Sequence, residues 1–339
     1  IYSKRKAGGP STVTNTGNIT VGANNATALF LENGGNLNLN AGTLNVGAGS
    51  YGVVAIGNKS FTYNNNAAVN VKLGTGATYF YSNNPTTNFT NNVALNTTSK
   101  GVYGISTTGN VVNNGNFTLG DKSVGILNTG SGTAKNMAAI TVGNSDVTNK
   151  DYAIGMATKT GTVENTASGV ITVGSSGIGL FADGANARAI NNGTINLNGA
   201  NAMGMYLDNR AIGINNGTIN VVGKDAIGMY ASGPGSTATN NAGHTINLSG
   251  DGSMGMYLDN GAKGVNDGTI TTVGSPKEAV GIVVRNGAEF ENNGTININS
   301  AGGFAFFKAN GGVIKNYGTF HISGGAKNMF LVLNQQEKK

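Results

Sequence analysis

The stretch AINNGTINLNGANAMGMYLDN (residues 189–209) is followed three residues later by GINNGTINVVGKDAIGMYAS (residues 213–232). Equivalent apolar residues of the two stretches, such as Ile195 and Ile219, lie 24 positions apart. A period of this size is typical of repeat proteins, whose units bury their apolar faces only by stacking on one another. The repeat therefore decides the fold class before any single motif is considered.

The repeat extends over almost the whole chain. When the apolar residue of GTIN is taken as an anchor, thirteen anchors follow one another at a mean spacing of about 25 residues. We expect one domain over residues 1–339, with a flanking segment at 1–10, coils over 11–333 and a tail at 334–339. The anchors are Ile19, Leu44, Val69, Val93, Phe117, Ile140, Ile171, Ile195, Ile219, Ile246, Ile270, Ile296 and Phe320.

Each repeat contains short segments in which apolar and polar residues alternate. In TINL, Ile195 and Leu197 would face one way and the residues between them the other, which is the pattern of a β-strand. The segment MGMYLD supplies a second strand, with Met203, Met205 and Leu207 facing inward, and a weaker segment supplies a third. The sequence predicts an all-β fold, a right-handed parallel β-helix (β-solenoid) of about 13 coils with three short strands per coil.

Glycine and asparagine have structural roles in such a fold. We expect the Asn-Gly pairs at 192–193, 216–217 and 293–294 to form corners that need a positive φ. Asparagines at equivalent positions of successive coils are expected to form ladders in which their amides bond one another.

Composition and charge exclude several function classes. Charged residues make up 11% of the chain, and its net charge of +6 is spread thinly, whereas a nucleic-acid surface shows a dense basic stripe. The chain has no cysteine, hence no disulfide or thiolate site, and no apolar run of about 18 residues that would form a membrane helix. His244 and His321 stand three coils apart and do not pair as metal ligands. We therefore expect no catalytic residues, no metal site and no cofactor.

The most suggestive surface feature is a column of aromatic residues. If Met205 and Leu207 face inward, Gly204, Tyr206 and Asp208 face outward, and equivalent positions carry the same residue types. The predicted surface is an aromatic stripe between a smooth glycine track and a row of carboxylates, which suits sugar rings or an extended peptide. Alternatively, the rings stack coil on coil and only stabilise the sheet. The candidate ligand-binding residues are Phe181, Asp183, Tyr206, Asp208, Tyr230, Tyr257 and Asp259.

Two details of this region leave alternatives open. Asp183 and Asp208 would be neighbours in adjacent coils, where they could splay into solvent, bind a cation or bind a polar ligand. The spacing from Ile140 to Ile171 is 31 residues, because of the extra segment NSDVTNKD at 144–151. Insertions in solenoids become loops on one face, so this segment is either a binding loop or a tolerated turn variation.

The iterated NNGTINVxG…GMY coils, rich in Asn and Gly and without cysteine, resemble passenger domains of type V (autotransporter) proteins of Gram-negative bacteria. They are similar to the large Asn-rich fusobacterial adhesins, over residues 11–333. The resemblance implies display at the cell surface or outer membrane, and adhesion to a glycan or protein receptor on host or bacterial cells. It implies anchoring through a C-terminal barrel that is not part of this chain.

We therefore expect a surface adhesin segment, a rigid β-helical rod that displays binding surface and is not an enzyme. The alternatives are a purely structural stalk of a larger surface protein and a carbohydrate-active β-helix enzyme. An enzyme of the latter kind needs clustered acids, whereas the 15 acidic residues of this chain are spread over 13 predicted coils.

Overall fold

The computed structural model describes residues 1–332, and the predicted tail at 334–339 lies outside them. The described residues contain only strands, turns and bends. They form two compact units, unit 1 (residues 1–172) and unit 2 (from residue 173 onward), which are described separately below. None of the described residues belongs to a helix long and apolar enough to cross a membrane.

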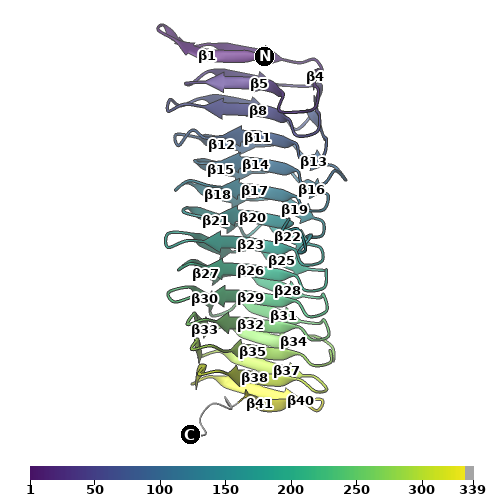
Figure 1. Ribbon diagram of the computed structural model, residues 1–339, viewed down its shortest axis with the longest axis vertical. Coiled ribbons are helices and arrows are strands. Elements are labelled where there is room, and N and C mark those ends of the chain that lie inside the picture. The colour runs from purple at the N-terminus through teal and green to yellow at the C-terminus, as the bar shows by residue number, and fades with distance from the viewer. Residues whose placement is uncertain (333–339) are drawn as a thin grey trace. The chain divides into compact units, whose positions relative to one another are not determined.

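In both units each coil contributes one strand to each of three parallel sheets, called here A, B and C (Figure 1). Sheet A contains the longest strands, sheet B the anchor strands and sheet C the strands that precede the anchors. Neighbouring strands within a sheet come from successive coils. This is the parallel β-helix that the sequence predicts, with about 13 coils over the two units.

The strands of unit 1 pair within each sheet in the order given. Sheet A contains β2 (Gly9–Pro10), β1 (Tyr2–Lys6), β5 (Thr27–Glu32), β8 (Tyr51–Ile56), β11 (Thr78–Ser82), β14 (Tyr103–Thr107), β17 (Val124–Asn128) and β20 (Ile154–Thr158). Sheet B contains β4 (Ile19–Val21), β7 (Thr43–Val46), β10 (Asn70–Leu73), β13 (Leu95–Asn96), β16 (Phe117–Leu119) and β19 (Ala139–Val142). Sheet C is in two pieces, β3 (Thr12–Asn15), β6 (Asn36–Leu39) and β9 (Thr62–Asn65), then β12 (Asn88–Asn91), β15 (Asn110–Asn113), β18 (Thr133–Asn136) and β21 (Thr162–Asn165).

Strand β22 (Val170–Val173) lies at the boundary between the units. In unit 2, sheet A contains β23 (Ile178–Asp183), β26 (Met203–Asp208), β29 (Ile227–Ser232), β32 (Met254–Asp259), β35 (Val280–Val284), β38 (Phe304–Ala309) and β41 (Lys327–Val332). Sheet B contains β25 (Thr194–Leu197), β28 (Thr218–Val221), β31 (Thr245–Leu248), β34 (Thr269–Thr272), β37 (Thr295–Asn299) and β40 (Thr319–Ser323). Sheet C contains β24 (Arg188–Asn191), β27 (Ile212–Asn215), β30 (Thr237–Asn240), β33 (Lys263–Asn266), β36 (Glu289–Asn292) and β39 (Val313–Asn316).

The strand at the beginning of the chain belongs to the sheet system. Residues 2–6 form β1, which pairs in parallel with β5 and antiparallel with β2. The flanking segment assigned from the sequence to residues 1–10 therefore contributes its own strand to sheet A.

Two of the thirteen anchors are wrong by two residues. Leu44 pairs with Val71 and Phe117 pairs with Leu95. The repeat spacing in the sequence places the anchors at Val69 and Val93 instead. All four of these valine and leucine side chains are buried. Because side chains alternate with a period of two, a shift of two residues leaves the same face buried, so the apolar pattern does not fix the register.

An asparagine ladder inside sheet C confirms the expected amide stacking. In unit 2 the Nδ2 of Asn191 donates to the Oδ1 of Asn215 at 2.8 Å, and the pattern repeats through Asn240, Asn266 and Asn292. All five side chains are fully buried. Several also donate to the carbonyl two residues on, as Asn215 does to Gly217. The ladder satisfies polar groups that would otherwise be costly to bury.

The expected positive φ at the Asn-Gly corners is wrong. Neither residue of the pairs 192–193, 216–217 and 293–294 has a positive φ, and the left-handed residues lie mainly in the turns that flank sheet A, for example Asn201 and Asn209. Glycine is needed at the corners for close approach. A Cβ on Gly217 would lie 2.1 Å from the carbonyl oxygen of Gly193, and one on Gly294 would lie 2.0 Å from that of Gly268.

Candidate functional site

The seven candidate residues all lie on sheet A of unit 2, in two neighbouring columns. The aromatic column runs from Phe181 through Tyr206 and Tyr230 to Tyr257, and each residue pairs in register with the next. All four rings are half-buried, and the Leu, Met or Ala residues on either side of each ring point into the core. The column continues with Val283 and Phe307 in the same register.

The rings of this column stack directly on one another. Ring centroids lie 5.4 Å apart between Phe181 and Tyr206, 4.9 Å between Tyr206 and Tyr230, and 5.4 Å between Tyr230 and Tyr257. The interplanar angles of 27° to 33° show that neighbouring rings lie roughly face to face, with a tilt. The column therefore presents ring edges and phenol hydroxyls to solvent, and its stacking stabilises the sheet.

The predicted smooth glycine track beside the rings is wrong. Gly204, Gly228 and Gly255 are buried, and a Cβ on Gly228 would lie 2.7 Å from Cγ2 of the core residue Ile246 and 2.6 Å from the carbonyl oxygen of Gly255. Two consecutive residues, Gly228 and Met229, thus face inward. The alternation of the strand is interrupted there, which the sequence pattern did not indicate.

This interruption moves the first residue of the long strands after β23 outward, whereas Ile178 at the start of β23 stays buried. Met203, which the sequence placed inside, is half-exposed, as are the equivalent residues Ile227, Met254 and Val280. An apolar column therefore flanks the aromatic column on sheet A of unit 2. The two columns together form a surface that is called here the aromatic face.

On its other side the aromatic face is edged by carboxylates whose neighbours hold them in place. Asn209 contacts both acids of the predicted like-charged pair, because its Nδ2 donates to Asp183 Oδ1 at 2.6 Å and its backbone N–H donates to Asp208 Oδ1 at 2.8 Å. Two N–H donors of Asn209 thus stabilise the two adjacent carboxylates by hydrogen bonds. Among the described residues, no group of three or more His, Cys, Asp or Glu side chains is arranged to hold a metal ion.

Arg285 and Asn286 are members of the face that sequence reasoning missed. Arg285 Nη1 donates to the hydroxyl of Tyr257 at 2.9 Å, and its Nε lies 3.9 Å from Asp259 Oδ1. Asn286 Nδ2 donates to the same oxygen of Asp259 at 2.6 Å. Comparison of the repeats could have found Arg285. Val284 pairs with Leu258, so the next residue, Arg285, lies beside Asp259 in the neighbouring coil.

Burial affects the ionisation of the central ring. The pKa of Tyr230 is raised above its usual value, chiefly because half-burial disfavours the phenolate, while a hydrogen bond with Ser232 acts in the opposite direction. Tyr230 is therefore a neutral phenol at physiological pH, able both to donate and to accept a hydrogen bond.

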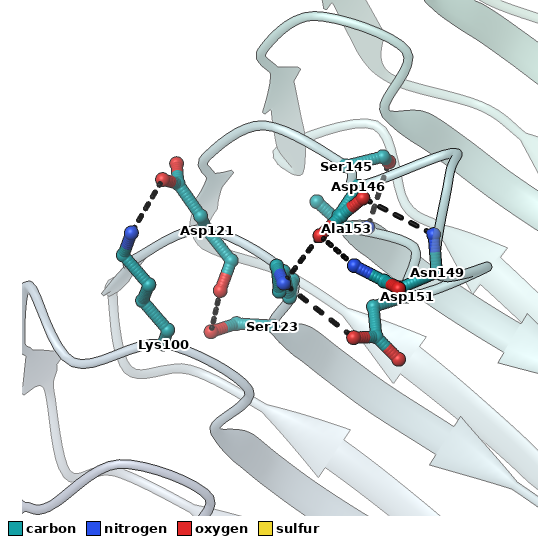
Figure 2. A network of polar contacts seen from close by, with 9 residues as sticks. Lys100, Asp121, Ser123, Ser145, Asp146, Asn149, Asp151 and Ala153 are labelled. Atoms are coloured by element: carbon teal, nitrogen blue, oxygen red, sulfur yellow. Dashed lines mark hydrogen bonds and ion pairs between the residues drawn. The ribbon is translucent and has the colours of Figure 1, made fainter.

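The insertion at 144–151 forms an ordered polar network in unit 1 (Figure 2). Asp146 and Asp151 form an antiparallel bridge, with backbone hydrogen bonds of 2.7 and 3.0 Å. Asn149 donates to Asp146 from its backbone N–H at 3.2 Å and from its side chain at 2.8 Å. At the base of the loop, Ser145 Oγ accepts the N–H of buried Ala153 at 2.9 Å.

A lysine of the preceding coil fastens this loop. Lys122 Nζ lies 2.6 Å from Asp146 Oδ2 and 3.5 Å from Asp151 Oδ2. The hydrogen bond from Lys122 is the largest of the influences that hold the pKa of Asp146 well below its usual range, and the same contact raises the pKa of Lys122. The insertion is thus fixed to the coil beneath it.

Comparison with known proteins gives one family. The family described as BigA third pectate lyase-like domain matches residues 2–215 and 239–331 of the chain. This is a β-helix domain of the kind found in bacterial surface proteins. No curated protein and no solved structure matches the chain.

Proposed function

Because the chain belongs to the family of the BigA third pectate lyase-like domain, we propose that it is an adhesive segment of a bacterial surface protein. In this proposal the aromatic face of unit 2 binds glycans of host or bacterial cells. The parent is then an outer-membrane adhesin of the type V class, and the segment has no enzymatic activity.

One observation carries the proposal, namely the unbroken, solvent-facing column from Phe181 to Tyr257 with fixed amides and carboxylates along one edge. Half-exposed apolar and aromatic side chains over four successive coils form a patch of the kind that marks interaction sites. Phenol hydroxyls, carboxylates and amides along such a patch suit a ligand that is rich in hydroxyl groups and has apolar ring faces, which is the chemistry of a glycan.

The second candidate function, a structural stalk, is favoured by the same stack. Because the rings occupy one another's faces, they bury apolar area within the sheet without any ligand. A stalk needs such lateral stabilisation but makes no use of Asp183, Asp208 or Asn209.

The test compares variants of the whole chain on glycan arrays and on partner cells. We expect Asp208→Asn combined with Asn209→Ala to lower glycan retention at least about tenfold, because the edge loses one carboxylate charge and one amide side chain while the ring stack is untouched. The triple replacement of Tyr206, Tyr230 and Tyr257 by Ser removes the column, and Tyr317→Ser, at a tyrosine that is 71% exposed outside it, is the control. Unchanged binding in the edge and column variants would reject the aromatic face as the glycan site, absence of binding by the unchanged chain would support the stalk, and depolymerisation of a glycan would reject the non-enzymatic assignment.

A further inference from the structure

A depression of about 370 Å³ lies beside the insertion loop of unit 1, on a different unit from the aromatic face. Its lining includes Tyr103, Val124 and Ile154 from the first positions of β14, β17 and β20, and Lys150, Asp151 and Tyr152 from the loop and the residue that follows it. The volume is at the lower end of the range of small-ligand sites, which begins at about 300 Å³. It fits a short ligand of one or two rings.

The loop side of this depression is built before any ligand arrives. The Asp146–Asp151 bridge and the contacts of Lys122 with both acids hold the backbone on either side of Lys150. Lys122 and Lys150 both have a positive φ, of 60° and 59°, a backbone conformation that costs free energy for residues other than glycine. A ligand would therefore meet a preorganised surface and would not have to order the loop.

The lining has the mixed character that a saccharide needs. Half-buried Tyr103 and exposed Tyr152 supply ring surface and hydroxyls, and Val124 and Ile154 supply a narrow apolar strip. Lys150 is exposed, and the Asp151 side chain is 56% exposed, so a donor and an acceptor remain accessible beside the strip. The two positive charges of Lys122 and Lys150 balance the two negative charges of Asp146 and Asp151, which favours a neutral ligand over an anionic one.

The same surface offers little to a peptide. Strand β17 is paired on both sides, with β14 and with β20, so no free strand edge is available for β-strand addition. The apolar strip is also narrow, because Val124 is only 6% exposed, so an amphipathic helix would find no groove for its apolar face.

We propose that this depression is a second ligand site, specific for a neutral mono- or disaccharide held between Tyr103, Tyr152, Lys150 and Asp151. The insertion that lengthens this one coil is then a binding loop, and it acts independently of the aromatic face. A chain with two separate saccharide sites would bind a branched or long glycan with increased avidity.

The experiment measures binding of lactose, N-acetyllactosamine, cellobiose and chitobiose to the whole chain by saturation-transfer NMR and calorimetry. A dimer of galacturonic acid is the anionic comparator. We expect at least one neutral disaccharide to bind, and Tyr152→Ala and Lys150→Ala each to weaken it about tenfold or more. Val147→Ala is the matched control, because Val147 is exposed on the same loop and is not among the lining residues.

Comparison with the aromatic-face variants separates this proposal from the proposed function. Loss of disaccharide binding in Tyr152→Ala but not in the Asp208→Asn, Asn209→Ala variant supports a distinct site in unit 1. The proposal is overturned if no neutral disaccharide binds, if binding survives both loop variants, or if only the anionic dimer or a peptide from a library is retained there. Thermal unfolding of each variant checks that the fold is retained. We expect it to be retained, because the side chains of Tyr152 and Lys150 take no part in the Lys122–Asp146 contact.

Discussion

The Nδ2 of Asn215 donates to the Oδ1 of Asn240 at 2.8 Å inside sheet C, and both side chains are fully buried. The Nδ2 of Asn240 in turn donates to the Oδ1 of Asn266 at 2.8 Å. Every rung of this ladder therefore depends on two neighbours, one in the coil before and one in the coil after. A change at one rung leaves polar groups without partners in two other coils.

Replacement of Asn240 by Ala tests the ladder. We expect a loss of about 2–3 kcal/mol in the free energy of unfolding, because a side-chain N–H of Asn215 and the side-chain Oδ1 of Asn266 lose their partners in a buried site. Urea unfolding followed by circular dichroism measures the loss. The matched control is Asn220→Ala in the outward ladder, where Asn220 donates to Asn196 at 2.8 Å but is half-exposed. Water replaces that bond, so the control should lose less than about 1 kcal/mol, and equal losses would contradict the argument.

The buried glycine of sheet A gives a second prediction. Gly228→Ala places a methyl group 2.6 Å from the carbonyl oxygen of Gly255 and 2.7 Å from Cγ2 of Ile246, so the coils must separate locally. We expect a destabilisation of about 1–3 kcal/mol in denaturant unfolding. Gly22→Ala is the comparison, because a Cβ there has no neighbour within 4 Å and the φ of Gly22 is not positive. That change should be neutral or slightly stabilising, and a neutral result at Gly228 would mean that the glycine faces solvent.

The Lys122–Asp146 contact makes the stability of unit 1 depend on acid pH. Because the folded-state pKa of Asp146 lies below the unfolded value of about 3.9, its stabilising contribution is complete above that pH. The contribution is lost as the pH falls further toward the lower folded-state pKa. Urea midpoints of unfolding, measured at successively lower pH from pH 5, should therefore fall less steeply in Asp146→Asn than in the unchanged chain. Asp251→Asn, an exposed acid with no ion pair among the described residues, serves as the control.

A buried tyrosine pair gives the corresponding prediction at alkaline pH. The hydroxyls of Tyr63 and Tyr79 lie 2.8 Å apart in the core of unit 1, and burial is the largest cause of the rise in the pKa of both phenols. A raised folded-state pKa means that the contribution is complete below about pH 10, the unfolded value, and is lost as the pH rises beyond it. We expect the chain to lose stability above pH 10 and the double variant Tyr63→Phe, Tyr79→Phe to lose less. Absorbance at the phenolate band during alkaline unfolding measures this, and free titration of both phenols in the folded chain would refute it.

Part of the candidate site followed from the sequence alone. The alignment placed Phe181, Tyr206, Tyr230 and Tyr257 in one column, and the structure pairs them in that register. The sequence left stacking of the rings coil on coil as one of two alternatives, and the ring distances of 4.9 to 5.4 Å confirm that they stack. The alignment did not connect Lys122 with the loop at 146–151, because an ion pair across coils leaves no periodic signal.

The sequence by itself determined the period, the three strands of each coil and the asparagine ladder, because each of these repeats every coil and stacking is the only way to bury the apolar faces. Only the tertiary structure decided the register of Val71 and Leu95 and the inward direction of Gly204 and Gly228. The physical reason is that alternation fixes which face of a strand is buried, whereas the position along the strand and the place where alternation breaks are set by contacts with the neighbouring coils.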